Sequence, residues 1–351
     1  MIFEKKILDL YNQLNKLKKK TKKKLIFSIG NTTKIDSEDY YFTPSRIFKS
    51  TIIFGIVVFN DEFAKLGTQL LDGKVDYIMV DAEKKILPKS DEIPGNIERR
   101  VRENIKTSKM LIYKGNDLTV DSIDLFLTYY FNDDIRGLGG KKITIVGAGN
   151  IGSKLALILL ERGSKVIICR RDFKKSSLIA KTINLIKPQN TVEKVIANKN
   201  IENACKNTDI LIGATNGKPA INAKMINSIK NTAIVIDAGK GTLQDKAVEL
   251  AQRRNIKIFR TDVTAALNGL IDKSLEMEKM MEKNFNIKKE KNYTLVSQGL
   301  LGSKNDIIVD DVNNPKTIYG VCNGKGDFLR KLNKKQSQII SILKKKYNLK
   351  I

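Results

Sequence analysis

Three glycines, Gly147, Gly149 and Gly152, are spaced as G-x-G-x-x-G in the segment ITIVGAGNIGSKLALILLERG. An apolar run precedes them and a helix with an apolar face is predicted to follow, which is the context in which this spacing binds a dinucleotide. Gly147 would permit a tight turn, Gly149 would let the backbone approach a pyrophosphate, and Gly152 would let the helix pack close to the strand. The backbone N–H groups that open the helix, at Asn150 and Ile151, would bind the phosphates.

The residues that end the next predicted strand, at 165–169, indicate which dinucleotide to expect. In sites for NAD an acidic side chain at this position accepts a hydrogen bond from the ribose 2′-hydroxyl. Here Arg170 and Arg171 occupy the position, and two guanidinium groups can bind a 2′-phosphate. We therefore predict NADP in preference to NAD. The alternative is that Asp172 binds the ribose of NAD while both arginines face solvent.

Small residues follow two later predicted strands, at the sheet edge where ligands of doubly wound folds bind. The first group is GATNG at 213–217, with Ala214 and Thr215 as candidate contacts. The second is DAGKG at 237–241, with Asp237 and Gly239. Both would let the nicotinamide ribose approach the backbone, although each group alone is also typical of a simple strand-to-helix turn.

The chain contains no histidine, which excludes an imidazole base, a His-bound metal and a Ser-His-Asp triad. Lysine is then the side chain expected to donate or accept the proton of the reaction, because burial and nearby cations can lower its pKa. The candidates are Lys49, from the amino-terminal part of the chain, and Lys240, at the sheet edge. Asp117 or Asp262 would pair with either. Lysine is abundant, so an exposed surface side chain is the ordinary alternative for each.

Composition and charge restrict the partners. The chain has 351 residues with a formal net charge of +26, and most of its 64 basic residues are lysines. Since arginine is the residue that binds phosphate and base edges with a planar fork, its scarcity makes a nucleic-acid partner unlikely and favours a solvated surface. A basic surface with exposed aromatic side chains would reverse that interpretation. Three scattered cysteines and no signal-peptide pattern indicate a cytoplasmic protein without a membrane segment or metal site.

The periodicity of apolar residues predicts an α/β protein. A helix is expected at 2–20, followed by strands at 25–29, 51–59, 77–80 and 110–113, which form an amino-terminal α/β substrate domain at 1–118. A connecting helix at 120–131 and a Rossmann doubly wound parallel sheet would occupy 119–272. Residues 273–351 would form an extension of short strands and helix. The Met- and Leu-rich helix at 265–283 would pack on the amino-terminal domain or on a second subunit of a homodimer.

This pattern resembles the superfamily of shikimate dehydrogenases and methylene-tetrahydrofolate dehydrogenases, which are Rossmann proteins of the amino-acid-dehydrogenase type. The resemblance covers about residues 116–262 and rests on GAGNIG, GATNG and VIDAG. Glutamyl-tRNA reductases share parts of it, but their amino-terminal cysteine and histidine have no counterpart here. In shikimate dehydrogenases a lysine and an aspartate bracket the substrate hydroxyl. The resemblance implies that Lys49 and Asp117 are the matching positions, although Gly115-Asn116-Asp117 lacks the family's spacing and following glycine.

We therefore predict an NADP-dependent oxidoreductase that acts on a small polar metabolite in a cleft between two domains. One alternative is an enzyme like a methylene-tetrahydropterin dehydrogenase, whose substrate carries the one-carbon unit. The other is a protein that binds or senses the dinucleotide without catalysing a reaction.

Overall fold

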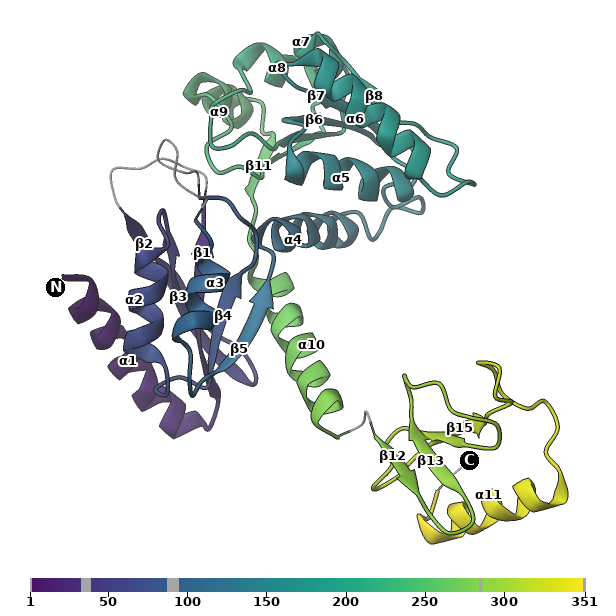
Figure 1. Cartoon of the computed structure of the whole chain (residues 1–351). Helices are drawn as coiled ribbons and strands as arrows, with labels where there is room; N and C mark the ends of the chain where they lie inside the picture. Colours follow the sequence, from purple (N-terminus) through teal and green to yellow (C-terminus); the bar gives the residue numbers. More distant parts are fainter. Residues whose placement is uncertain (1, 33–38, 87–94, 284–285, 350–351) are drawn as a thin grey trace. The chain divides into compact units, whose positions relative to one another are not determined.

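The computed structural model describes residues 2–32, 39–86, 95–283 and 286–349, and the chain divides into two compact units, Met1–Asn268 and Gly269–Ile351. The first unit contains two sheets, and the second contains one (Figure 1). The predicted α/β fold class is confirmed. The predicted domain limits, 1–118, 119–272 and 273–351, stay a prediction.

The first sheet has the strand order β2-β3-β1-β4-β5. Four strands are parallel and β2 is antiparallel to β3. Helices α1, α2 and α3 contribute to one core cluster with this sheet, which includes Phe3, Ile7 and Val101. The strands are β1 (Lys24–Asn31), β2 (Tyr40–Ile47), β3 (Thr51–Val58), β4 (Tyr77–Asp81) and β5 (Lys109–Tyr113), and the helices are α1 (Ile2–Thr21), α2 (Glu62–Leu71) and α3 (Ile97–Asn104).

The second sheet is fully parallel, in the order β11-β10-β9-β6-β7-β8. This is the Rossmann order 3-2-1-4-5-6 read from its far edge, so the chain reverses direction across the sheet between β6 and β9, where such folds bind ligands. Its strands are β6 (Lys142–Val146), β7 (Lys165–Cys169), β8 (Ile196–Ala197), β9 (Ile210–Gly213), β10 (Ile234–Asp237) and β11 (Lys257–Arg260).

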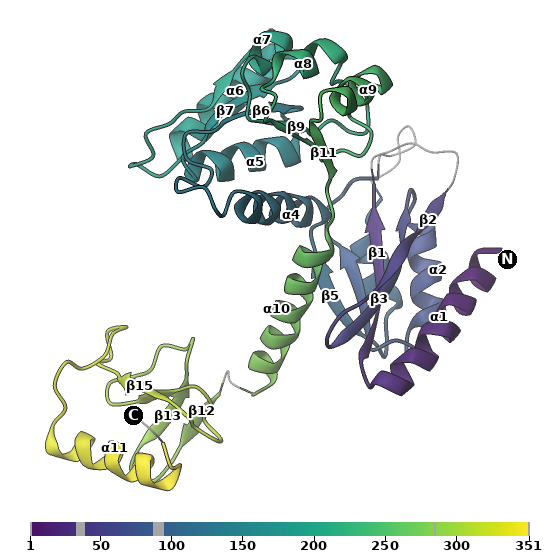
Figure 2. The ribbon, with the colours of Figure 1, turned by 180° about the vertical axis from the view of Figure 1, so that it is seen from behind.

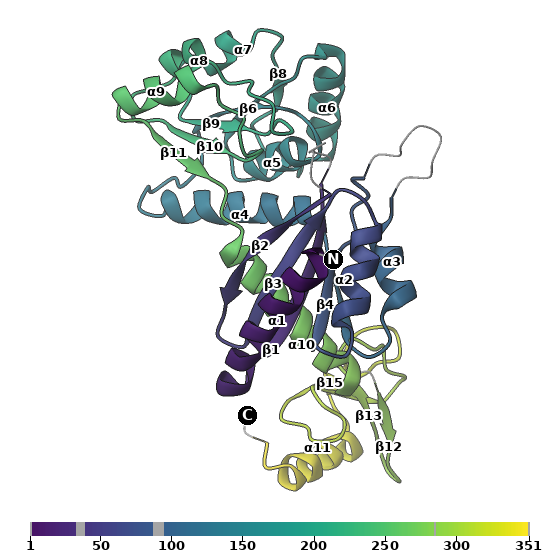
Figure 3. The same ribbon diagram turned by 90° about the vertical axis from the view of Figure 1, so that its left-hand side faces the viewer.

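Helices cover both faces of this sheet (Figure 3). One core cluster combines the sheet with α4, α5 and α6, and the other combines it with α7, α8 and α9. The helices are α4 (Gly115–Tyr130), α5 (Asn150–Glu161), α6 (Phe173–Ile186), α7 (Ile201–Cys205), α8 (Ala223–Ser228) and α9 (Asp245–Arg253). Because α4 begins five residues before the predicted start, Asp117 lies in its first turn.

The second unit holds a four-stranded sheet, in the order β12-β13-β14-β15, and the helix α11 (Figure 2). Leu295, Ile307, Val309 and Val321 on one face form a core with Leu343 of α11. The elements are β12 (Ile287–Lys289), β13 (Thr294–Ser297), β14 (Ile307–Val309), β15 (Ile318–Val321) and α11 (Lys334–Lys346). The long helix α10 (Thr264–Lys283) spans the boundary between the units. Within the described residues, no helix combines the length and apolarity that a membrane span requires.

Candidate active site

The glycine loop between β6 and α5 has the geometry that its spacing predicted. Gly147 has φ +112°, and a Cβ there would lie 2.5 Å from the carbonyl oxygen of Ala214. A Cβ on Gly152 would lie 2.0 Å from the carbonyl oxygen of Gly147, so the helix and the loop are in close contact. A Cβ on Gly149, in contrast, would have no atom within 4 Å. Two of the glycines therefore serve packing, and the third faces open space.

The first backbone N–H groups of α5 are not capped by a side chain. Its N-cap is Gly149, which has no side chain and makes no side-chain capping bond. The first amides of a helix lack partners within the helix and carry a positive partial charge. The backbone of Asn150 and Ile151 thus offers an anion site next to the open space at Gly149.

Two arginines follow β7, and one of them is fixed against the glycine loop. Arg170 donates from Nη1 to the carbonyl oxygen of Ala148 at 3.0 Å and is half-buried. Arg171 is exposed. Asp172, the alternative ribose acceptor, is the N-cap of α6, where its carboxylate accepts from the backbone N–H of Lys175 at 3.1 Å.

Asp237 holds the loop that follows β10. It is 4% exposed, and its carboxylate accepts from the backbone N–H groups of Gly241 at 2.8 Å and Thr242 at 3.1 Å, and from the Thr242 hydroxyl at 2.7 Å. Burial alone would raise the pKa of Asp237, but these hydrogen bonds lower it below its usual value. The loop turns through Lys240, which has φ +54°. Asp237 therefore fixes the conformation of the loop that contains Gly239 and Lys240.

Replacing Asp237 by asparagine is expected to lower the free energy of unfolding at pH 7 by about 1–3 kcal/mol, because buried donors lose a charged acceptor. A carboxylate with a lowered pKa stabilises the fold above its unfolded pKa of about 3.9 and loses this effect as the pH falls through the folded value. Urea unfolding at several pH values should show a constant difference above about pH 5 that shrinks below about pH 4. Asp245→Asn, at an exposed position of the same segment, is the control. Equal stability of both variants at pH 7 would contradict this role.

A cavity of about 1520 Å³ in the first unit brings most of the predicted residues together. This volume exceeds the range of ordinary small-molecule pockets, as a dinucleotide with a substrate requires. The predicted residues that line it are Gly147, Gly149, Asn150, Ile151, Arg170, Arg171, Ala214, Thr215, Gly239 and Lys240. Gly152 and Asp237 do not line the cavity but support the loops that do.

Two of the three candidate catalytic residues do not line the cavity. Lys49 lies in the turn before β3, whose Thr51 pairs with Lys24 at the amino end of β1. Asp117 forms ion pairs with Lys154 of α5 and, at 3.6 Å, with Lys114. Asp262, the other candidate partner, accepts hydrogen bonds from the backbone and hydroxyl of Thr264.

A lysine that the sequence interpretation missed does line the cavity. Lys85 Nζ lies 2.7 Å from Oδ2 of Asp81 and 2.9 Å from Oε2 of Glu83, and the three side chains are 14%, 2% and 15% exposed. We call Asp81, Glu83 and Lys85 the acidic–lysine cluster. Burial raises the pKa of Asp81 above its usual value, although the ammonium group of Lys85 opposes the shift. The cluster thus combines a fixed cation with a carboxyl group that binds a proton more readily than usual.

Backbone groups and neighbouring side chains fix this cluster at the carboxyl end of β4. Asp81 Oδ1 accepts from the backbone N–H groups of Glu83 at 3.0 Å and Gly115 at 3.2 Å, and Glu83 accepts from that of Asn116 at 2.7 Å. Asn31 donates from Nδ2 to the carbonyl oxygen of Glu83 at 2.6 Å. The signal in the sequence was Asp81 directly after an apolar strand, in a segment, DAEKK, that also resembles an exposed loop.

One protein-family model and two known proteins match parts of this chain. Residues 129–280 match the family described as D-isomer specific 2-hydroxyacid dehydrogenase, NAD binding domain. A glutamyl-tRNA reductase of Campylobacter jejuni is 24% identical over 144 residues, which are 41% of this chain and 31% of that protein. The shikimate dehydrogenase (NADP(+)) of Archaeoglobus fulgidus is 41% identical over 66 residues, 16% of this chain and 24% of the relative. The chain thus spans less than a third of each of these relatives.

Solved structures of similar proteins include a shikimate dehydrogenase in complex with NADP+, 17% identical, with a TM-score of 0.40 over 72% of this chain and 96% of the other. An L-tryptophan dehydrogenase of Nostoc punctiforme is 12% identical, with a TM-score of 0.41 over 72% of this chain and 77% of that one. The family match and the strand order show that residues 129–280 contain an NAD(P)-binding Rossmann domain of the dehydrogenase type, in agreement with the resemblance that GAGNIG, GATNG and VIDAG indicated.

Proposed function

We propose that this protein is an NAD(P)-dependent oxidoreductase that prefers NADP(H) and acts on a small polar metabolite. The observation that carries the proposal is a single cavity whose lining includes the glycine loop, Lys240 and Lys85. The proposed dinucleotide site and a side chain that can donate or accept a proton thus line the same cavity. Hydride transfer requires both next to the substrate.

The groups that line the cavity match the parts of a dinucleotide. The uncapped amides at Asn150 and Ile151 and the open space at Gly149 match a pyrophosphate. Ala214 and Gly239 line the cavity after β9 and β10, where a ribose can approach the backbone. When bound, the nicotinamide supplies or accepts the hydride.

The contacts and charges of the residues that follow β7 support the preference for NADP(H). Asp172 lines the cavity too, but it caps α6 through Oδ1 and its Oδ2 lies 3.8 Å from Lys175 Nζ, so both oxygens already have partners that compete with a ribose hydroxyl. Arg170, Arg171 and Lys175 line the cavity there and offer positive charge to a 2′-phosphate.

The acidic–lysine cluster supports a role for Lys85 on the substrate. In the reductive direction, Lys85 would donate a proton to the oxygen of a carbonyl group as hydride reaches its carbon, which turns the carbonyl into an alcohol. The two carboxylates hold the ammonium group at one position, and after the transfer the neutral amine of Lys85 takes up a proton from solvent. In this proposal Lys85 takes the place of Lys49, while Lys240, the other lysine predicted for the role, also lines the cavity. Asn116 and Tyr41 also line this part of the cavity and offer polar contacts to a substrate.

Titration with NADPH and NADH, followed by the fluorescence of the bound nucleotide, tests the cofactor. Wild type should bind NADPH more tightly than NADH. Arg171→Gln should raise the Kd for NADPH by about 10- to 100-fold and change that for NADH little, because a charge-assisted bond to the 2′-phosphate is lost. Arg170→Gln should do the same and also weaken NADH somewhat, since Arg170 also supports the glycine loop.

Lys175→Gln should give a smaller effect, because Lys175 is an exposed point charge whose amine also lies 3.8 Å from Asp172. Equal affinity of wild type for the two nucleotides would refute the NADP preference. No affinity for either nucleotide would remove the oxidoreductase proposal as a whole.

A further inference from the structure

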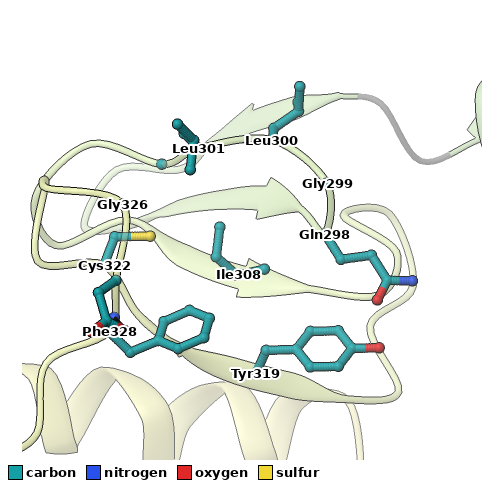
Figure 4. Close-up of a pocket in the computed structure, with 11 residues that line it drawn as sticks. Gln298, Gly299, Leu300, Leu301, Ile308, Tyr319, Cys322, Gly326 and Phe328 are labelled. Atoms are coloured by element: carbon teal, nitrogen blue, oxygen red, sulfur yellow. Dashed lines mark hydrogen bonds between the residues drawn. The ribbon is translucent and has the colours of Figure 1, made fainter. Parts of the chain in front are cut away.

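The face of the carboxy-terminal sheet that α11 does not cover carries a cavity of about 260 Å³ (Figure 4). Its floor is apolar and buried, because Ile308 and Cys322 are each 6% exposed. Its wall is aromatic, since Tyr319 and Phe328 line it and are 47% and 42% exposed. We call this cavity and its rim the aromatic face. It belongs to the second unit, and none of its lining residues lines the cavity of the first unit.

The backbone is arranged to present these two rings. The register between β14 and β15 shifts between Ile308 and Val309, so that Val309 pairs with Ile318, while Ile308 pairs with Gly320. Ile318 and Val321 thus both pack in the core under α11, and Tyr319 lines the cavity instead, as a β-bulge can arrange. A Cβ on Gly320 would lie 2.6 Å from the ring of Phe328. Gly320 is therefore required for the Phe328 ring to lie against the strand.

Polar groups stand at the rim of the aromatic face. Gln298 lines the cavity and offers both a donor and an acceptor, and Figure 4 shows its amide on the side of Tyr319. Asp327 also lines it, and its carboxylate accepts from the backbone N–H of Phe328 at 2.7 Å. These are the groups that a planar heterocycle with N–H and carbonyl edges would meet.

The second unit is basic, with two lysines near the aromatic face and five more on α11, which covers the other face of the sheet. Between 286 and 349 there are thirteen Lys or Arg residues against five Asp or Glu. Lys325 lies in the turn between β15 and Phe328, and Lys304 lies next to it, 2.9 Å from the Cβ position of Gly324. Both side chains are exposed, and neither makes an ion pair within the part of the chain that the structure describes. The unit as a whole thus carries a net positive charge that attracts a polyanion, and the one carboxylate that lines the cavity is that of Asp327.

We propose that the aromatic face binds single-stranded nucleic acid, with a base stacked on Tyr319 and Phe328 and the neighbouring phosphates on Lys304 and Lys325. Exposed aromatic rings on a sheet, with cations around them, are the arrangement that binds unpaired bases without sequence preference. A duplex, whose bases are stacked inside, cannot use the rings. This is also the combination of basic surface and exposed aromatics that would overrule the scarcity of arginine.

The test measures the anisotropy of fluorescein-labelled 12-nucleotide RNA and DNA single strands, and of the matching duplexes, with the full chain in 50 mM NaCl. Single strands should bind more tightly than duplexes, and comparison of RNA with DNA identifies the preferred sugar. Tyr319→Ala and Phe328→Ala should each weaken single-strand binding by about 5- to 100-fold, and Tyr319→Phe should retain it. Lys304→Gln and Lys325→Gln should each reduce the slope of log affinity against log salt by about 0.7.

Tyr129→Ala, at a tyrosine that is 73% exposed in the first unit, is the matched control and should leave binding unchanged. Absence of binding in 50 mM NaCl, or binding that survives the loss of both rings, would overturn the proposal. So would a homodimer that forms through this face: light scattering would then show a dimer that Leu301→Asp dissociates, because Leu301 lines the cavity and is 84% exposed.

Discussion

Replacing Lys85 by methionine is expected to lower kcat by about 100- to 10,000-fold, the usual contribution of a positioned proton donor. Methionine keeps the length of the side chain and removes the only charge of the acidic–lysine cluster that can donate to a substrate oxygen. The Kd for NADPH should stay within about twofold of wild type, because the groups proposed to bind the dinucleotide belong to the Rossmann sheet. The measurement is the loss of NADPH absorbance with a panel of 2-oxo acids and polar cyclic ketones.

Two further variants separate catalysis from folding. Lys85→Met leaves Asp81 buried without its cation, which can cost about 3–5 kcal/mol of stability, whereas removal of both charges costs much less. The double variant Asp81→Asn with Lys85→Met should therefore be more stable than Lys85→Met alone and remain inactive. Lys114→Met, at an exposed lysine of the same region, should keep full activity. Full activity of Lys85→Met would exclude the lysine from the reaction, and a wild type that reduces no compound of the panel would favour a protein that only binds the dinucleotide.

The dinucleotide half of the site could be predicted from the sequence because it is local. Gly147, Gly149 and Gly152 lie in one strand, turn and helix, and each has a distinct steric reason to be glycine. The loops after β9 and β10 could also be assigned, because parallel strands bring their carboxyl ends to one edge of the sheet. For Asp237 the spacing leaves two functions open, because a carboxylate at a strand end can bind a ligand or hold its own loop, and its hydrogen bonds favour the second.

The substrate half could not be predicted, because it depends on how the strands of the first sheet are oriented and connected. Lys49 precedes β3, so it lies at the amino end of a parallel strand of eight residues, about 25 Å long, and not at the carboxyl end where Lys85 lies. The strand β2, whose antiparallel pairing places Lys49 in a hairpin turn, was not predicted either. It is a half-exposed edge strand with Pro44 in it, without a clear apolar alternation.

The edge strand β8 and the sheet of the second unit were also harder to predict, because their strands are short or irregular. At the edge of the Rossmann sheet β8 has two residues and pairs on one side only, so little in the sequence marks it as a strand. In the second unit, short strands were predicted, but the irregular register at Ile308 and Val309 was not. That shift decides on which face Tyr319 lies. The short strands could therefore be predicted from the sequence, but the face on which Tyr319 lies could not.

Placing a carboxylate at Gly149 should weaken NADPH binding while leaving the fold intact. Gly149 is the N-cap of α5, and aspartate is a better N-cap than glycine by a few tenths of a kcal/mol, so Gly149→Asp should melt at the wild-type temperature or slightly above it. The backbone φ of −96° and the open space around the Cβ position both accept a side chain. The new negative charge would stand where we place the pyrophosphate, and about 4 kcal/mol of repulsion at 4 Å corresponds to a Kd raised by about 100- to 1000-fold.

Gly149→Asn is the matched control for this prediction, because asparagine caps a helix as aspartate does and has almost the same shape without the charge. The asparagine variant should bind NADPH less tightly than wild type for steric reasons, and the aspartate variant should bind much less tightly again. High salt should reduce the difference between the two, since screening weakens repulsion between charges near solvent. If both variants bound NADPH like wild type, no phosphate would lie at Gly149, and the helix terminus would be open for another reason.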